Sequence, residues 1–290
     1  MERYVLMTAA HNEAKLIGAT IESVLAQTVR PALWIIVSDR STDDTDTIVA
    51  RYCSEHSFMR LIHLDDDIER GTTAKVNALR CAYDEISQYD YDFIGNVDAD
   101  VSFDSRYFER LLHHFRLNPT LGIAGGHIYE LQRGEFRPRR SNSVTSVAHA
   151  AQLVRRQCYY EISGYIALEY GGEDWYAEIR ARSRGWQVRA FPELKIMHHR
   201  PTGGADSLLR HRFREGKMDF SVGSHPAFEV VKCMRRFPEH PVGIGSIARF
   251  AGFLSSYLSS DMPLVPPQTI AFLREEQMNK LKKFIYRQPY

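Results

Sequence analysis

The sequence contains no long hydrophobic run. No window in its 290 residues approaches about 18 uninterrupted apolar residues, so a membrane-spanning helix is not expected. The N-terminal stretch MERYVLMTAAHNEAK is charged and polar where a signal peptide needs an apolar segment. The four cysteines are widely scattered and form no C-x-x-C pair, which argues against a disulfide framework. These absences predict a reduced, cytoplasmic globular protein.

An excess of charge of one sign is missing as well. The net charge is +1, from 37 Lys and Arg against 36 Asp and Glu, which excludes a disordered acidic chain and a polycation. The charges are nevertheless unevenly distributed. Residues 1–199 carry 23 basic and 28 acidic side chains, a net −5, and residues 200–290 carry 14 and 8, a net +6. We expect the acidic body and the basic tail to meet different partners.

The first 100 residues alternate between short apolar runs and stretches of helical periodicity. The apolar runs cover residues 4–8, 34–37, 59–64 and 93–97. The helical stretches cover residues 14–27, 41–52 and 74–86. This order predicts βαβ units, and hence a parallel sheet with helices on both faces.

Polar side chains cluster where these strands end. Asn12 and Glu13 follow the first strand, Asp39 the second, and Asp98 and Asp100 the fourth. In open α/β sheets the ligand crevice lies outside the carboxyl ends of the strands. The sequence therefore predicts several acidic side chains around one crevice.

The second hundred residues are less regular. Residues 122–130 are predicted as a strand, 148–155 as a helix, and 173–184 as a helix that opens on acidic residues. Residues 187–197 are predicted as two strands with a turn at Pro192, ending on two histidines.

Asp98 and Asp100 are the first candidates for chemistry. Two carboxylates one residue apart can share a hard divalent cation such as Mg²⁺ or Mn²⁺. Alone, this spacing also fits a solvated turn. The apolar run FIGNV before it favours the cation, because carboxylates this close at the end of a buried strand need a counter-charge.

Three further candidates each leave two interpretations open. Asp39 can accept the imide N–H of a uracil ring, or merely cap the next helix. In the stretch GGEDW, Asp174 beside Glu173 can act as a general base, or form an ordinary acidic helix N-terminus. His198 and His199 can join the carboxylates on a cation, or simply be partly exposed at a strand end.

The order of these motifs resembles a known family. Strand–AHNE, strand–SDRSTD, strand–DAD, GGEDW and strand–HH occur together over roughly residues 3–200. The set resembles the inverting GT-A glycosyltransferases of family 2, in particular the non-processive bacterial members that build polysaccharides and glycolipids. The resemblance implies an α/β fold of the GT-A type, a mostly parallel, Rossmann-like central sheet flanked by helices, with a C-terminal helical extension.

The resemblance also implies a role for each matching residue on the donor side. Ala9, Asn12 and Glu13 match the loop that lies against the nucleotide. Asp39 matches the residue that reads the base, and Asp98 the carboxylate near the ribose or metal. A UDP-type sugar donor is slightly favoured.

The remaining matches concern the metal and the acceptor. Asp100 matches a metal ligand, and either His198 or His199 matches a third ligand. Asp174 matches the base that deprotonates the acceptor hydroxyl, with Glu173 beside it. The implied reaction moves a sugar from a nucleoside diphosphate to a saccharide or lipid-linked acceptor with inversion, and it depends on Mg²⁺ or Mn²⁺.

Two positions depart from the family pattern. Arg40 stands where a small residue is usual, near the nucleotide. Thr72 stands where a basic residue often contacts the diphosphate, so that contact would fall to Lys75 or Arg70. The Q-x-x-R-W motif of processive synthases is absent.

The sequence leaves two rival functions. A sugar-phosphate nucleotidyltransferase would have a Gly-rich loop with Arg and Lys after the first strand, where this chain has AAHNEAK. A non-catalytic nucleotide- or nucleic-acid-binding protein would need a recognised binding signature, which the basic tail lacks. We therefore expect no nucleic-acid partner.

The implied organisation has three parts. Residues 1–100 would form the nucleotide-sugar-binding half of one domain, 101–205 its acceptor-binding half, and 206–290 a basic helical extension. Residues 242–258 of the extension carry a continuous apolar stripe at helical spacing. The stripe could pack on the catalytic domain or make a peripheral contact with the anionic inner face of a membrane. Arg212, Arg214 and Lys217 could also help the diphosphate to leave.

Overall fold

The structure is a computed structural model, and it describes residues 2–64, 73–132, 134–200, 208–239, 241–259 and 261–285. The chain divides into two compact units. The first comprises Met1–Ala167 and Glu173–Pro201, and the second comprises Leu168–Gly172 and Thr202–Tyr290. The first unit contains the expected two-part domain except for residues 168–172 and 202–205, which belong with the expected extension to the second unit. The division of that domain after residue 100 stays a prediction.

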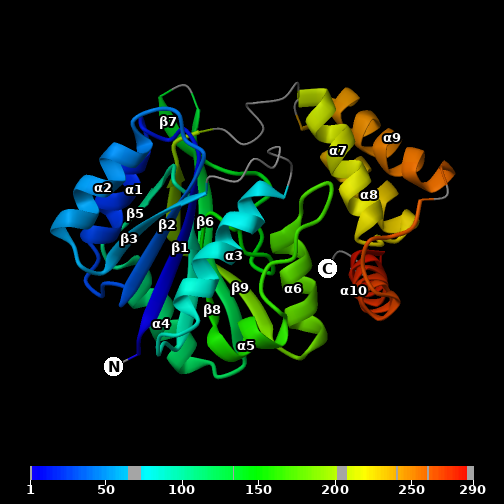
Figure 1. The fold of residues 1–290 in the computed structure, drawn as a ribbon. Coiled ribbons are helices and arrows are strands. Elements are labelled where there is room, and N and C mark those ends of the chain that lie inside the picture. The colour runs from blue at the N-terminus through cyan, green and yellow to red at the C-terminus, as the bar shows by residue number, and fades with distance from the viewer. Residues whose placement is uncertain are drawn as a thin grey trace. The chain divides into compact units, whose positions relative to one another are not determined.

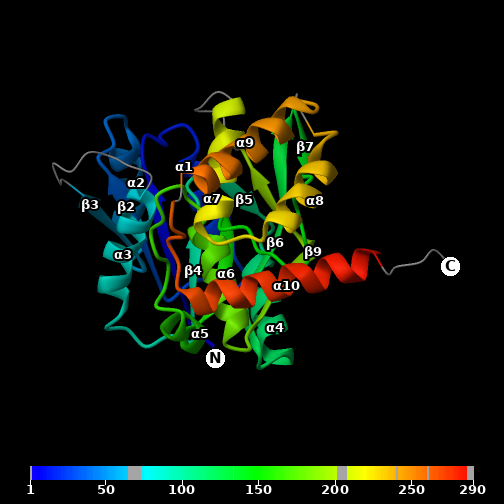
Figure 2. The same cartoon turned by 90° about the vertical axis from the view of Figure 1, so that its right-hand side faces the viewer.

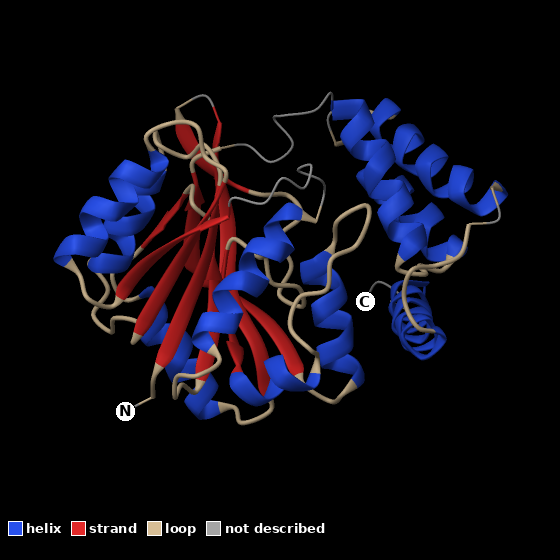
Figure 3. Cartoon of the chain, viewed as in Figure 1, coloured by secondary structure: helices blue, strands red, loops and turns tan. Residues whose placement is uncertain are grey.

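A single mixed sheet forms the centre of the first unit (Figures 1 and 3). Its strands run in the order β3-β2-β1-β4-β8-β6-β9-β5, with β7 added on β6. The strands are β1 Tyr4–Ala10, β2 Leu33–Asp39, β3 Met59–Leu64, β4 Phe93–Val97, β5 Val101–Phe103, β6 Leu121–Gln132, β7 Glu135–Pro138, β8 Ala151–Arg155 and β9 Gln187–His198. The run β3-β2-β1-β4 is parallel, as the βαβ pattern predicts, whereas β8 pairs antiparallel with both β4 and β6.

Helices cover both faces of this sheet. One apolar cluster joins the sheet to α1 (Ile17–Leu25), α2 (Thr45–Glu55) and α4 (Tyr107–Leu117). A second cluster on the opposite face joins it to α3 (Ala74–Ile86), α5 (Arg156–Glu161) and α6 (Glu173–Ser183). Because both faces are covered, the central strands are buried along their whole length, which explains their continuous apolar runs. The α/β fold class expected from the sequence is confirmed.

The prediction of a helix over 148–155 is wrong. Residues 151–155 form β8, whose buried side chains lie between β4 and β6. The run AAQLV is buried on both faces, Gln152 included, so it shows neither a helical nor an alternating period, and only its strand neighbours decide its conformation. The turn predicted at Pro192 is instead a bulge within β9, where the register on β6 jumps from Phe191 to Lys195.

The second unit contains four helices within the described residues (Figure 2). These are α7 Leu208–Ser221, α8 Pro226–Arg236, α9 Ile244–Leu258 and α10 Pro267–Ile285. The backbones of α7 and α9 approach so closely that a Cβ on Gly216 would lie 1.9 Å from the Arg249 carbonyl oxygen, and one on Gly252 would lie 2.0 Å from the Phe213 carbonyl oxygen. Only glycine fits at these two positions.

Arg249 of α9 is the charged centre of this packing. Its side chain is 3% exposed, and its Nε lies 2.9 Å from Asp219 Oδ2 and 3.2 Å from Glu229 Oε1. Lys232 of α8 donates to the other oxygen of Asp219 at 2.7 Å. Burial opposes the ionisation of Asp219, but the charges of Lys232 and Arg249 outweigh it and lower the pKa of that carboxyl. A buried ion network therefore ties α7, α8 and α9 together.

The close approach of α7 and α9 predicts the effect of one methyl group. Gly216→Ala should destabilise the helical unit by about 3 kcal/mol, because the backbone of α9 cannot move aside. Gly18→Ala in α1 is the matched control, since nothing lies within 4 Å of that position, and it should stabilise by about 0.5 kcal/mol. Urea denaturation followed by circular dichroism measures both, and equal effects would contradict the packing described.

Candidate functional site

The carboxyl ends of β1 and β2 and the start of α3 enclose a pocket of about 220 Å³. Ala9, Glu13, Asp39 and Lys75, four of the residues expected to contact the nucleotide, line it. They share the pocket with residues to which the sequence assigned no role there: Ala10, His11, Ala74 and Arg200. Residues far apart in the chain thus meet at the strand ends, as the sheet topology requires.

Asn12, also expected at the nucleotide, does not line this pocket. It adopts a left-handed φ of 53°, and its Oδ1 accepts a hydrogen bond from the Thr42 backbone N–H at 2.8 Å. Its own N–H donates to Ser41 Oγ at 3.2 Å. Asn12 therefore joins the loop after β1 to the loop after β2. It supports the wall of the pocket but does not itself line it.

Asp39 is buried at the end of β2, and Arg40 pairs with it. Arg40 Nε donates to Asp39 Oδ1 at 2.9 Å, and Nη2 lies 2.8 Å from the same oxygen. The Asp39 backbone oxygen is 2.6 Å from His11 Nδ1. The arginine that replaces the usual small residue thus neutralises the carboxylate next to it.

Asp98 lies at the end of β4 and binds two donors. Lys75 Nζ donates to its Oδ1 at 2.7 Å, and Asn96 Nδ2 donates to the same oxygen at 3.1 Å. Burial raises the pKa of Asp98, but the charge of Lys75 outweighs it and holds that pKa well below the usual range. Burial alone would lower the pKa of Lys75, which the charges of Asp98, Glu173 and Asp174 raise instead. The Asp98 carboxyl is therefore ionised at neutral pH.

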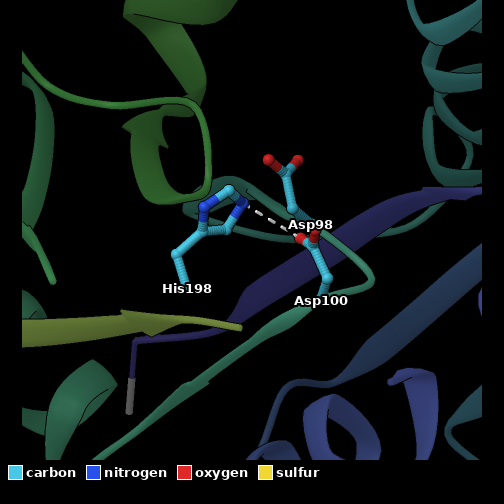
Figure 4. Close-up of side chains that lie close together, drawn as sticks. All are labelled: Asp98, Asp100 and His198. Atoms are coloured by element: carbon cyan, nitrogen blue, oxygen red, sulfur yellow. Dashed lines mark ion pairs between the residues drawn. The ribbon is translucent and has the colours of Figure 1, made fainter. Parts of the chain in front are cut away.

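Asp98, Asp100 and His198 form the one group within the described part of the chain that could hold a metal ion (Figure 4). One ligand atom from each residue lies within 4.8 Å of the others, and His198 Nε2 is 3.2 Å from Asp100 Oδ1. Two carboxylates and one imidazole are oxygen and nitrogen donors of the kind that Mn²⁺ and, less readily, Mg²⁺ accept. The donor set therefore fits the divalent cation expected from the sequence.

His199, the alternative third ligand, lies apart from this group. Its Nε2 is 2.8 Å from Ser102 Oγ, and its ring packs edge-on against Phe136. Neighbouring residues on an extended strand point to opposite sides, so only one of the two histidines can face the aspartates.

Glu13 and Arg200 complete the edge of the site. Arg200 Nη2 binds Glu13 Oε2, and Arg200 Nε lies 3.7 Å from Asp100 Oδ2. Burial raises the pKa of Glu13 to about 7, although Arg200 opposes the shift. Arg200 is the countercharge shared by the two carboxylates.

The N-terminus of α6 carries Glu173 and Asp174. Burial, and then the charge of Asp174, raise the pKa of Glu173. Asp174 Oδ1 accepts the backbone N–H of Trp175 at 2.7 Å. His149 Nδ1 is 3.9 Å from Glu173 Oε1, and neither of the two buried ring nitrogens of His149 has a hydrogen-bond partner within the described residues.

Comparison with known proteins identifies the family. The model of glycosyl transferase family 2 matches residues 6–170, which is more than half of the chain. The chain belongs to glycosyl transferase family 2. The family expected from the motifs is thereby confirmed.

Family 2 relatives with curated names are longer than this chain. A poly-beta-1,6-N-acetyl-D-glucosamine synthase of Staphylococcus epidermidis is 29% identical over 126 residues, which are 43% of this chain and 28% of that protein. The synthase of the same name from Staphylococcus aureus strain COL matches over the same length and identity. The match therefore spans little more than a quarter of these relatives.

Solved structures share the fold at low identity. The mannosyltransferase PcManGT from Pyrobaculum calidifontis, solved with GDP-Man and Mn²⁺, has a TM-score of 0.58 at 14% identity and covers 99% of this chain and 88% of its own. S. aureus TarS 1–349 with UDP-GlcNAc has a TM-score of 0.55 at 13% identity, with 89% and 73% covered. In the described residues, no helix has the length and apolar character needed to cross a membrane.

Some expected family 2 contacts cannot be placed in the first unit. Arg70 and Thr72 lie outside the described residues. Arg212 belongs to the second unit, where its Nη1 donates to Glu215 at 2.9 Å and its Nη2 donates to Glu239 at 3.4 Å. Lys217 of the same unit lies over the ring of Tyr170, 5.3 Å from its centroid.

Besides Ala10 and Ala74, three residues of the site with basic side chains were missed from the sequence, namely His11, His149 and Arg200. His11 and Arg200 adjoin the recognised motifs AHNE and HH, so each motif could have been extended by one residue. His149 lies in the segment wrongly predicted as a helix, and no local signal relates it to Glu173.

Proposed function

We propose that the chain transfers a sugar from a nucleoside-diphosphate sugar to an acceptor hydroxyl with inversion, in the assembly of a polysaccharide or glycolipid. One observation carries the proposal. The carboxylates Asp98 and Asp100 and the imidazole of His198 come together at the strand ends, in the same unit as a pocket lined by Asp39 and Lys75. This arrangement suits a charged diphosphate bound through a cation, with the nucleoside beside it.

A uridine-type donor suits the pocket best. The buried carboxylate of Asp39 can accept the imide N–H of uracil. The ring N–H of guanine lies between different neighbouring groups. S. aureus TarS was solved with UDP-GlcNAc, and the curated relatives are named as N-acetylglucosamine polymer synthases. UDP-GlcNAc is therefore the first donor to test, with a saccharide or lipid-linked acceptor.

Asp98, Asp100 and His198 would hold the Mg²⁺ or Mn²⁺. When bound, the cation supplies positive charge that stabilises a departing nucleoside diphosphate. Lys75 and Arg200 line the same pocket and add positive charge for the phosphates. His198 favours Mn²⁺, because imidazole is a poor ligand for Mg²⁺.

Asp174 would take the proton from the acceptor hydroxyl. It lies at the N-terminus of α6, and its Oδ1 accepts the Trp175 backbone N–H at 2.7 Å, which leaves its Oδ2 for the acceptor hydroxyl. Glu173, whose pKa is raised, would stay nearer to its protonated form and orient the acceptor. The alkoxide formed attacks the anomeric carbon from the face opposite the leaving diphosphate, which gives inversion.

The helical unit supports a peripheral membrane contact. Five large apolar side chains of α9 are exposed, among them Ile247 at 64% and Leu258 at 73%. The buried side of the same helix is made mainly of small residues around Arg249. Small residues inside and large apolar residues outside is the packing pattern of helices in lipid.

The same helix is too short to cross a bilayer. Its 15 residues span about 22 Å, against roughly 30 Å of hydrocarbon. Arg249, its one charged residue, is buried, so α9 exposes no charge along its length. We propose that α9 lies in the plane of a membrane surface, where a lipid-linked acceptor would be found.

The metal proposal predicts a difference between two adjacent histidines. His198→Ala should weaken Mn²⁺ binding by at least about tenfold, because a ligand is lost. His199→Ala is the control and should bind Mn²⁺ as the unaltered chain does. Electron paramagnetic resonance of free Mn²⁺, without nucleotide, measures both, and equal affinities for the two variants would rule out His198 as a ligand.

The base proposal predicts a loss of turnover without a loss of binding. Asp174→Asn should lower kcat about 10²–10⁴-fold, while the asparagine oxygen still accepts the Trp175 N–H. Donor binding, measured by calorimetry with Mn²⁺, should be unchanged. Full turnover of this variant would exclude Asp174 as the base. Release of pyrophosphate by the unaltered chain from a nucleoside triphosphate and a sugar phosphate would instead identify a nucleotidyl transfer.

The membrane proposal predicts sedimentation with vesicles. The full chain should co-sediment with vesicles of mixed neutral and anionic phospholipid, and the variant Ile247→Ser with Leu258→Ser should lose most of this binding. Leu117→Ser alters an equally exposed side chain on α4 and serves as the control. Binding that the α9 variant leaves intact would contradict the proposal.

A further inference from the structure

A second and larger cavity lies on the face of the sheet that carries α3 and α5. Its volume is about 590 Å³, within the range of roughly 300–1,000 Å³ typical of small-molecule sites. Four tyrosines line it: Tyr83, Tyr159, Tyr160 and Tyr165. No role expected from the sequence falls on any of them.

Three of these rings form a rigid wall. The centroids of Tyr83 and Tyr159 are 5.0 Å apart, and those of Tyr159 and Tyr165 are 5.7 Å apart. The Tyr165 hydroxyl accepts a hydrogen bond from Gln152 Nε2 of β8 at 2.8 Å. Rings that pack against one another and are hydrogen-bonded keep their places when the cavity is empty, so little ordering is needed on binding.

A buried arginine holds the turn that forms one edge of the cavity. Ser163 and Gly164 both have left-handed backbones, with φ of 53° and 61°. Arg180, which is 5% exposed, donates through Nη2 to the Gly164 carbonyl at 2.6 Å and through Nη1 to the Ile162 carbonyl. A serine in this conformation is strained, and the two hydrogen bonds from Arg180 maintain it.

The outer part of the cavity is polar and open to solvent. Tyr160 is 79% exposed and offers a free ring face. Arg80 and Asp84, one turn apart on α3, are exposed and also line the cavity. Donors, acceptors and an aromatic face are thus presented together at one opening.

We propose that this cavity binds a saccharide. A pyranose ring has apolar C–H faces, which pack on tyrosine rings, and a rim of hydroxyl groups, which bind to charged and hydroxyl side chains. An acyl chain would leave Arg80 and Asp84 without hydrogen bonds on binding, which is costly for charged groups. The mixture of tyrosine faces with both a donor and an acceptor fits a sugar better.

The cavity is linked to the acidic end of α6 by direct contacts. The Tyr165 ring lies against the His149 ring, with centroids 4.3 Å apart, and His149 Nδ1 is 3.9 Å from Glu173 Oε1. If the proposed function holds, the bound sugar is a part of the acceptor chain away from its reacting end. The site then favours longer acceptors over monosaccharides.

The test measures sugar binding without catalysis. Trimers of β-linked N-acetylglucosamine and of mannose are titrated into the full chain by calorimetry, with EDTA present and no nucleotide. At least one trimer should bind, and Tyr160→Ala should weaken it about tenfold, while Tyr160→Phe, which keeps the ring, should not. Arg80→Ala should also weaken binding. Both side chains are exposed, so these variants should fold normally.

Two results would overturn the proposal. One is the absence of binding by either trimer at millimolar concentration, and the other is binding that Tyr160→Ala and Arg80→Ala leave unchanged. The Asp100→Ala chain separates this site from the proposed transfer reaction, because it should lose metal-dependent donor binding and keep the trimer. If the chain binds the sugar but transfers none, the result would support the saccharide site and contradict only the proposed function.

Discussion

The mutual repulsion of carboxylates at one edge of the sheet is the constraint that governs how the candidate site is arranged. Glu13 follows β1, Asp98 and Asp100 both follow β4, and Glu173 and Asp174 begin α6. Lys75 and Arg200 neutralise part of this charge by direct contact. Burial raises the pKa values of Glu13 and Glu173, and the charges of neighbouring carboxylates add to both shifts.

Much of the parallel half of the sheet could be predicted from the sequence, because each strand there is an apolar run ended by polar residues. The residues 59–64 and 93–97 form strands with the predicted bounds, and 74–86 form the predicted helix. The same reasoning failed for β8, whose run is buried on both faces. Local periodicity cannot distinguish a strand from a helix when both sides are buried.

The site was predictable as a set of motifs but not as a set of contacts. Asp98 and Asp100 were found because they follow a strand directly, and the structure adds that His198 rather than His199 faces them. That choice depends on the phase of the strand pleat, which two adjacent histidines do not reveal. His149 meets Glu173 only through the fold of β8 against the sheet, so no spacing in the chain could indicate it.

The ion network around Arg249 has a consequence for how the second unit loses its structure. If α9 separated from α7, Asp219 and Glu229 would stay desolvated on the remaining helices without the guanidinium that balances them. Partial opening is therefore more costly than complete opening, in which water solvates every charge. The three helices joined by this network should behave as one cooperative folding element, with no stable state in which a single helix has detached.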